Sequence, residues 1–184
     1  MKVLLGIAGS IAADQAAELV RLLGKNGDDV HVVMTPAATE FVRPLTFQTL
    51  SRNQVFVDQF APPAEWRPEH IALSECDLAV VAPATANTLA KMRFGIADNL
   101  LTATLLATRA PVVVAPAMNA GMWSAAATQE NVAALKARGV RFVGPESGEL
   151  ACGVEGAGRM ASPDAIFSAI AGCRPSNVRK GQAK

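Results

Sequence analysis

The sequence lacks an excess of charge of either sign. Its 17 lysine and arginine residues nearly balance its 16 aspartate and glutamate residues, which leaves a formal net charge of +1 over 184 residues. Proteins that bind nucleic acid or an anionic membrane surface by electrostatic attraction carry a basic patch or a basic tail. The balance therefore argues against a nucleic-acid partner and against a membrane partner.

Long apolar runs are also missing. The apolar stretches are as long as strands and are broken by glycine, proline or aspartate, whereas a helix needs about 20 apolar residues to cross a bilayer. An apolar segment follows Met1 and Lys2 directly, without the three-part anatomy of a signal peptide. We therefore expect no membrane-spanning segment and a cytoplasmic protein.

Cysteine and histidine are scarce. Cys76, Cys152 and Cys173 are too few and too scattered for a disulfide framework, and they lack the spacing of metal ligands. Cys76 and Cys173 have apolar neighbours and look structural, and no metal site is expected. His31 falls inside an expected strand and is assigned no chemistry. His70 follows a long loop and is a candidate acid or base, with a structural role as the alternative.

What the sequence has is apolar segments in regular alternation. Hydrophobic residues make up 51% of the chain, and strand-length runs alternate with runs at helical spacing, which predicts one α/β domain with a doubly wound parallel sheet. We expect the domain over residues 1–173 and a polar, disordered tail over 174–184. The expected strands are 3–8, 29–34, 54–57, 78–82, 111–115 and 140–143. The expected helices are 12–25, 44–51, 89–108 with a break at Gly95, 124–138 and 163–171.

The stretch 78–88 is central to the functional prediction. Its first half is a continuous apolar run, typical of a strand buried on both faces, and we expect Pro83 to end it. Thr85, Asn87 and Thr88 then begin a helix at the carboxyl edge of the sheet, where unpaired N–H groups favour an anion such as phosphate. The alternative is that these side chains only cap the helix.

The first two expected strands end in a similar way. Gly9 and Ser10 follow the first strand and Thr35 follows the second, so small hydrogen-bonding groups recur at the same edge. The third glycine of the dinucleotide fingerprint is absent, which favours a mononucleotide. Asn119 follows a later strand, where its amide suits a carboxylate or a flavin edge, unless it only caps the next helix.

Two segments look unsuited to regular structure. The segment 145–160 contains four glycines around Cys152, which excludes a stable helix and favours a flap that presents the thiol. The loop 60–69 contains three prolines and Trp66. We expect that loop to form an interface or a wall of the site.

Three motifs together identify a family resemblance. Residues 82–88 read Ala-Pro-Ala-Thr-Ala-Asn-Thr, residues 116–123 read Pro-Ala-Met-Asn-Ala-Gly-Met-Trp, and residues 150–153 read Leu-Ala-Cys-Gly, followed by Gly-Arg-Met at 158–160. In this order they resemble the flavin-containing cysteine decarboxylases, most closely those that act in coenzyme A biosynthesis. The resemblance runs from Val3 to about Ile170.

The resemblance implies a flavodoxin-like (Rossmann-like) protomer that binds FMN and assembles into trimers or dodecamers, with the active site between subunits. The implied catalytic residues are His70, Asn119 and Cys152. The implied substrate-binding residues are Asn119, Met122, Leu150 and Ala151. The implied cofactor-binding residues are Gly9, Ser10, Ile11, Thr35, Thr85, Ala86, Asn87, Thr88, Ala117 and Met118.

The implied reaction is FMN-dependent decarboxylation of 4′-phosphopantothenoylcysteine to 4′-phosphopantetheine. Oxidation of the carbon that bears sulfur gives a thioaldehyde, which accepts the electrons left when CO₂ departs. By resemblance His70 is the acid or base, Asn119 holds the substrate carboxylate or amide, and Cys152 gives a proton as the enethiol is reduced. Bacterial relatives often carry a fused ligase domain. By resemblance this chain is therefore either a stand-alone enzyme, with a separate phosphopantothenate–cysteine ligase as a partner, or an excised half of a fused protein.

Three other functions remain open at this point. A peptidyl-cysteine decarboxylase shares the flavin and the histidine but releases the enethiol, and the motif around Cys152 argues against it. A flavin prenyltransferase fits Pro-Ala-Met-Asn and His70 poorly. A non-enzymatic regulatory flavoprotein usually has an acidic tail, which is absent here. The chain departs from the family at Asp14 and Gln15, where many relatives have an aromatic residue and a lysine.

Overall fold

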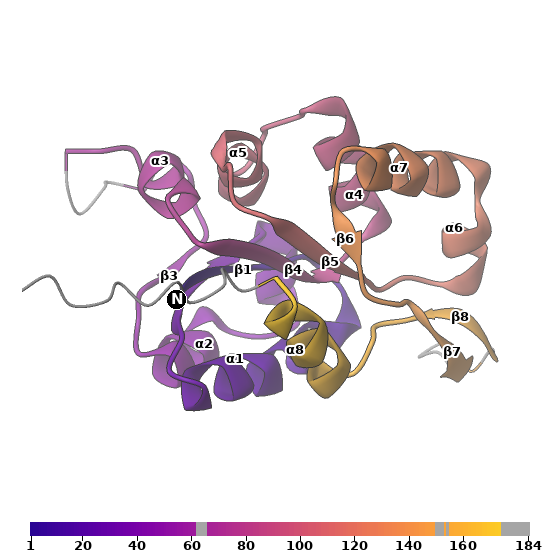
Figure 1. Ribbon diagram of the computed structural model, residues 1–184, viewed down its shortest axis with the longest axis horizontal. Coiled ribbons are helices and arrows are strands. Elements are labelled where there is room, and N and C mark those ends of the chain that lie inside the picture. Colours follow the sequence, from indigo (N-terminus) through magenta and orange to yellow (C-terminus); the bar gives the residue numbers. More distant parts are fainter. Residues whose placement is uncertain (62–65, 150–152, 154, 174–184) are drawn as a thin grey trace, which may run out of the picture.

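A six-stranded parallel sheet forms the centre of the computed structural model, which describes residues 1–61, 66–149, 153 and 155–173. The strand order is β3-β2-β1-β4-β5-β6, with helices on both faces (Figure 1). Without the two-residue edge strand β3, the order is that of a flavodoxin-like sheet. The predicted fold class is confirmed. The strands are β1 (Lys2–Ile7), β2 (Asp29–Met34), β3 (Val55–Phe56), β4 (Leu78–Ala84), β5 (Val112–Pro116) and β6 (Arg141–Phe142).

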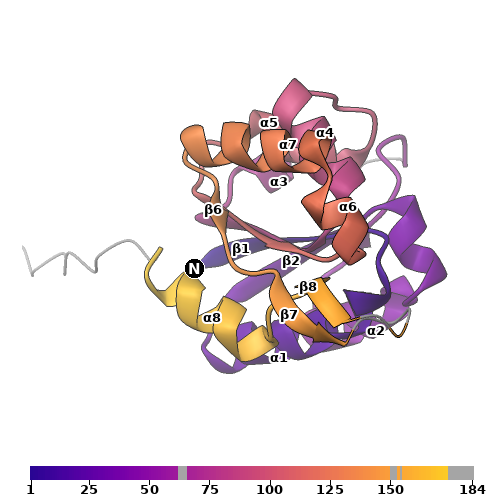
Figure 2. The ribbon, with the colours of Figure 1, turned by 90° about the vertical axis from the view of Figure 1, so that its right-hand side faces the viewer.

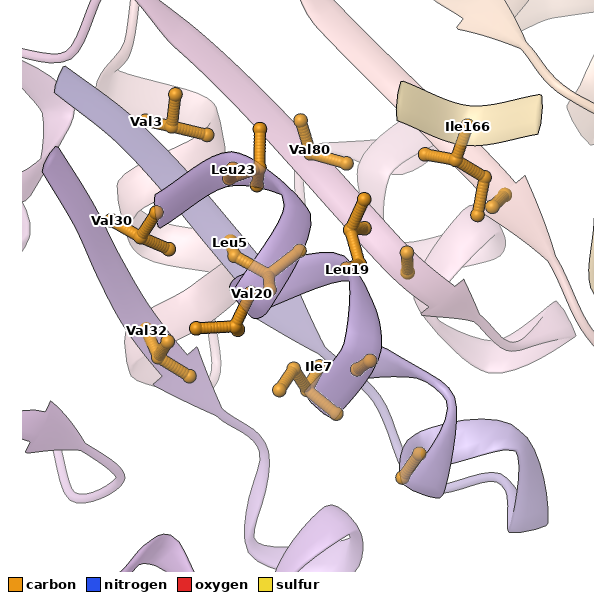
Figure 3. Close-up of a cluster of buried hydrophobic side chains, with 14 of the residues drawn as sticks. Val3, Leu5, Ile7, Leu19, Val20, Leu23, Val30, Val32, Val80 and Ile166 are labelled. Carbon is orange, nitrogen blue, oxygen red and sulfur yellow. The ribbon is translucent and has the colours of Figure 1, made fainter. Parts of the chain in front are cut away.

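The helices divide between the two faces according to the alternation of side chains in β1. Val3, Leu5 and Ile7 point to one face and pack with α1 (Ala16–Lys25), α2 (Pro44–Ser51) and α8 (Pro163–Ala171), as Figure 3 shows in part. Leu4 points to the other face. The helices there are α3 (Glu69–Ser74), α4 (Ala86–Phe94), α5 (Leu100–Ala107) and α7 (Ala126–Ala137). Two layers of helix thus bury the sheet on both sides, which explains the unbroken apolar runs of its strands.

Several expected helices are divided. The segment 12–25 begins as a 3₁₀ turn over Ile11–Asp14 before α1 starts at Ala16, and a second 3₁₀ turn covers Pro36–Glu40. The segment 124–138 is preceded by a separate short helix, α6 (Ala120–Ser124), and Ala125 leaves the helical conformation between α6 and α7. In contrast, α2 and α8 lie where the sequence predicts them, each with proline in its first turn.

The prediction that Pro83 ends the central strand is wrong. Strand β4 continues to Ala84, although its pairing with β5 shifts register between Val81 and Ala84. This irregularity accommodates a residue that has no N–H to donate. The Pro83 carbonyl still accepts a hydrogen bond from the N–H of Ala8, at 3.1 Å. The strand therefore reaches the edge of the sheet and delivers Thr85 there.

The described residues of the glycine-rich segment form an antiparallel hairpin, which the sequence did not predict; the predicted opening and closing of a flap stays a prediction. Strand β7 (Glu146–Glu149) pairs with β8 (Glu155–Arg159), and the hairpin lies beside α6 (Figure 2). Gly158 is required at this contact, because a Cβ there would collide with the Met118 carbonyl oxygen. That Gly158 carbonyl accepts a hydrogen bond from the Met118 N–H at 2.9 Å. The hairpin is thus fixed by its base to the end of β5.

Cys76 and Cys173 have structural positions, as the sequence predicts. Cys76 packs against the cluster on the α4 face, and Cys173 packs against the cluster on the α1 face. Both are free thiols. In the described part of the chain, no helix combines the length and the apolar character needed to span a bilayer.

Candidate functional site

A cavity of about 600 Å³ opens at the carboxyl edge of the sheet. It lies where the strand order reverses, between β1 and β4, which is the position at which doubly wound sheets bind ligands. Eight of the ten predicted cofactor-binding residues line it. They are Gly9, Ser10, Thr35, Thr85, Asn87, Thr88, Ala117 and Met118. Topology therefore brings together residues that are more than 100 positions apart in the sequence.

The N-terminus of α4 forms one wall of this cavity. Thr85 Oγ1 accepts a hydrogen bond from the Thr88 N–H at 3.2 Å and lies 3.0 Å from Thr88 Oγ1. Thr85 is thus a helix cap, which was one of the two alternatives, and it also lines the cavity. The two functions coexist because the other N–H groups of the first turn have no partner within the helix. These groups and the helix dipole make this wall favourable for an anion.

The turns after β1 and β2 repeat this arrangement. Ser10 caps the first 3₁₀ turn and Thr35 caps the second, with hydrogen bonds of 3.4 Å and 3.3 Å to backbone N–H groups. Gly9 lets the two turns approach, because a Cβ there would lie 2.6 Å from the Cβ of Ala37. The glycine is therefore needed for the shape of the cavity.

Another part of the cavity lining is apolar. Ala117 and Met118 follow β5, and Met122 lies on α6 with half of its surface exposed. Methionine side chains are flexible and polarisable and make favourable contacts with aromatic rings. A flat heteroaromatic group fits this wall, and a phosphate fits the wall formed by α4. The residues present therefore suit a flavin mononucleotide, and the volume lies in the range of small-molecule sites.

Asn119 does not line the cavity. Its side-chain oxygen accepts a hydrogen bond from the Gly121 N–H at 2.8 Å and caps α6. The capping alternative is thus correct for that oxygen. The residue is exposed and adjoins Met118, so it lies next to the cavity mouth.

His70 lies apart from the cavity within one protomer. It is half-buried in the first turn of α3, a helix that packs against α5. In Figure 1, α3 lies towards the opposite end of the sheet from α6 and the hairpin. His70 and Asn119 are thus not brought together by the fold of a single chain.

The remaining predicted residues divide into two groups. Ile11 and Ala86 do not line the cavity, and Ile11 is 62% exposed on the neighbouring turn. Leu150, Ala151 and Cys152 lie outside the described residues, as does the tail 174–184. Their predicted roles stay predictions.

Sequence reasoning missed Lys91 as a site residue and left open whether Asp98 and Asn99 cap a helix or face the site. All three line the cavity. Lys91 lies one turn after Thr88 on the same face of α4, which is the signal that could have identified it. Asn99 accepts from the Thr102 N–H at 3.0 Å and caps α5, so a second helix N-terminus meets the cavity.

Asp98 carries the clearest electrostatic perturbation at this site. Lys91 Nζ lies 2.9 Å and 2.7 Å from its two carboxylate oxygens. The hydrogen bond from Lys91 is the main cause that lowers the pKa of Asp98. Asn99 Nδ2 donates to the same carboxylate at 3.0 Å.

Comparison with known proteins matches almost the whole described chain to one family. The family model described as Flavoprotein matches residues 1–174. Among curated proteins, the coenzyme A biosynthesis bifunctional protein CoaBC of Haemophilus influenzae is 46% identical over 169 residues, and that of Vibrio vulnificus is 50% identical over 163 residues. These matches cover 91% and 88% of this chain but 42% and 41% of the relatives. The chain thus spans less than half the length of these relatives.

Solved structures share the fold over nearly their full length. A mutant PPC decarboxylase complexed with pantothenoylaminoethenethiol has a TM-score of 0.83 at 32% identity, covering 92% of this chain and 96% of that chain. The FMN-dependent cysteine decarboxylase SpaF has a TM-score of 0.78 at 33% identity, covering 92% and 97%. The FMN-binding protein AtHal3 has a TM-score of 0.80 at 31% identity, covering 100% and 98%.

Proposed function

Because the chain belongs to the Flavoprotein family, whose members are expected to hold a flavin, we propose that it binds FMN and decarboxylates 4′-phosphopantothenoylcysteine to 4′-phosphopantetheine. The observation that carries the proposal is the cavity itself, whose walls come from the two motifs at 82–88 and 116–123. The phosphate is assigned to the α4 wall and the ring to the methionine wall. The identity of 46% to 50% with CoaBC proteins supports coenzyme A biosynthesis as the setting.

Peptidyl-cysteine decarboxylation is the second candidate. SpaF is as similar to this chain as PPC decarboxylase is, at 33% against 32% identity, so overall structure does not separate the two substrates. Cys152 favours the first candidate. That reaction ends with reduction of the enethiol, which requires a proton donor, whereas the peptide reaction releases the enethiol without reducing it.

Bound FMN would accept a hydride from the substrate and later return it. His70 moves a proton at the substrate thiol, since an imidazole can act as an acid or as a base. Asn119 holds the substrate carboxylate or amide next to the cavity mouth through its side-chain amide. Cys152 donates the proton that goes to the carbon from which CO₂ departed.

We propose that a second copy of the chain completes the active site. His70 lies on α3, away from Asn119, so a neighbouring protomer supplies it in a homotrimer or a dodecamer. Phe60 and Trp66 are 83% and 89% exposed, and large exposed aromatic side chains are characteristic of interfaces. We therefore retain the loop 60–69 as part of this interface; its residues 62–65 lie outside the described residues.

Two measurements test the proposed function. The cofactor released by heating the purified protein is expected to be FMN on chromatography; FAD, a nicotinamide, or no flavin after reconstitution would contradict the assignment. Incubation with 4′-phosphopantothenoylcysteine is expected to yield a product with the mass of 4′-phosphopantetheine. Turnover of a C-terminal cysteine peptide in preference to this substrate would support the second candidate instead.

A further inference from the structure

Lys91 is a sheltered cation on the cavity wall. It lies on α4 one turn after Thr88, and its side chain is 21% exposed. Among the described residues that line the cavity, it is the only one with a positive charge at neutral pH. A lysine largely withdrawn from water has a stronger effect on a nearby anion than one on an open surface.

In the structure, the carboxylate of Asp98 balances this charge. Lys91 Nζ contacts both oxygens of Asp98, at 2.9 Å and 2.7 Å. Gly95, with a φ of 70°, turns the chain between α4 and α5 and so brings the two residues together. Asp98 is the less sheltered partner, because its side chain is 51% exposed. The carboxylate can therefore be hydrated if the lysine leaves.

A phosphate at the α4 wall changes this balance. A phosphate monoester carries nearly two negative charges, whereas Asp98 carries one, so the phosphate attracts Lys91 more strongly at an equal distance. Asp98 meanwhile repels the phosphate, because both lie near helix N-termini that face the same cavity. A lysine stem has four rotatable bonds, and its charge can move between two acceptors without movement of the backbone.

We propose that Lys91 binds the phosphate of the bound mononucleotide and that the carboxylate of Asp98 competes with the phosphate for it. Lys91 thereby makes the site prefer FMN over riboflavin. The inference rests on the proposed function, because it assumes that the cavity binds a flavin. It assigns to Lys91 a specificity role for the phosphate and no role in proton or hydride transfer.

The test is the ratio of the dissociation constants of riboflavin and FMN, measured by quenching of flavin fluorescence on the apoprotein. In Lys91→Gln the carboxylate of Asp98 remains without its counter-charge, so FMN affinity is expected to fall about tenfold or more while riboflavin affinity stays within about twofold. Lys91→Arg should retain the preference. Lys25→Gln, a lysine of α1 outside the cavity, is the charge-matched control and should leave both affinities unchanged.

Asp98→Asn separates this role from a structural one. If Lys91 binds the phosphate, removal of the competing carboxylate should strengthen FMN binding. If the ion pair only fixes the α4–α5 connection, Lys91→Gln and Asp98→Asn should weaken FMN and riboflavin equally, which would overturn the inference. The inference would also be overturned if Lys91→Gln left the ratio of the riboflavin and FMN dissociation constants unchanged but raised the KM of the phosphorylated substrate more than that of the unphosphorylated one. Lys91 would then be assigned to the substrate phosphate. A parent protein that binds neither flavin would overturn the proposed function itself.

Discussion

The cavity and the α3 region contribute to the proposed reaction in different ways. Gly9, Thr35 and Thr85 follow three strands of one sheet, and a single chain brings them into one cavity. His70 lies on α3, a six-residue helix that packs on α5 outside that cavity. Most of the predicted cofactor-binding residues are thus gathered by one chain, whereas on our proposal His70 reaches a site only in an assembly.

The difference follows from how each region is held. Parallel strands end at a common edge, so residues after their carboxyl ends meet wherever they lie in the sequence. Helix α3 is only six residues long and leads into the amino-terminal end of β4, where the Asp77 N–H donates to the Lys2 carbonyl, so its first turn does not reach that edge. A motif can thus mark both regions, but only the first is brought to the cavity by the fold of one chain.

The largest expected effect comes from removal of the imidazole. His70→Asn should retain the flavin and lose decarboxylation by about 10²–10⁴-fold, because general acid–base groups contribute that much. CO₂ release and the flavin absorbance measure the two properties separately. His31→Asn is the matched control, since His31 lies on β2 paired with Asp29 at 2.8 Å. Retained turnover in His70→Asn would leave His70 with a structural role.

The next effect changes the product rather than the first steps. Cys152→Ser should still oxidise and decarboxylate the substrate, but a hydroxyl is a far weaker acid than a thiol, so reduction should stall. Mass spectrometry should detect a product two hydrogens lighter than 4′-phosphopantetheine. A solved relative in a mutant form is complexed with pantothenoylaminoethenethiol. Cys76→Ser should give saturated product, and saturated product at the parent rate from Cys152→Ser would make that thiol a bystander.

The hairpin should respond to a single methyl group. Gly158→Ala places a Cβ against the Met118 carbonyl oxygen. We therefore expect the free energy of unfolding to fall by about 1–3 kcal/mol and the Met118 amide to exchange hydrogen faster. Gly24→Ala is the control, because no atom lies within 4 Å of an added Cβ at that helical position. It should stabilise the protein slightly. Equal melting temperatures and equal exchange in the two variants would show that the close contact is not required.

The smallest effect is an acid titration. Since Lys91 lowers the pKa of Asp98 in the folded state, the pair stabilises the protein above the ordinary carboxyl pKa, and the effect is lost as pH falls through the lowered value. The side chain is exposed, so the effect on stability is small. An NMR titration should place the Asp98 midpoint lower in the parent than in Lys91→Gln. Coincident midpoints would show that the contact is absent in solution.

Most of the fold could be predicted because the spacing of apolar residues indicates which segments are buried strands and which are helices. β4 is buried along its whole length. Helix α8 begins at the predicted residue, Pro163, whereas α4 begins at Ala86, three residues before the predicted start. The register shift at Pro83 could not be predicted, since it depends on the neighbouring strand. The β7–β8 hairpin was missed because glycine-rich strands carry no apolar alternation, and this hairpin is held by its contact with Met118.

The candidate site was predictable to the extent that its residues follow strands. Thr85 and Ala117 have that position and line the cavity. Ile11 has it as well but points outwards, because the 3₁₀ turn after Ser10 rotates its side chain away. Lys91 was missed because its pairing with Asp98 depends on the turn at Gly95, which only the folded chain shows.

Complementation between two inactive variants tests the central claim, that one active site uses residues of two copies. His70→Asn and Asn119→Ala should each be inactive alone. If His70 of one copy serves the cavity of another, equal mixing by co-expression should give about a quarter of the sites both residues and restore that fraction of the parent activity. If both residues act within one protomer, every site lacks one of them. A mixture as inactive as its components would contradict the shared site.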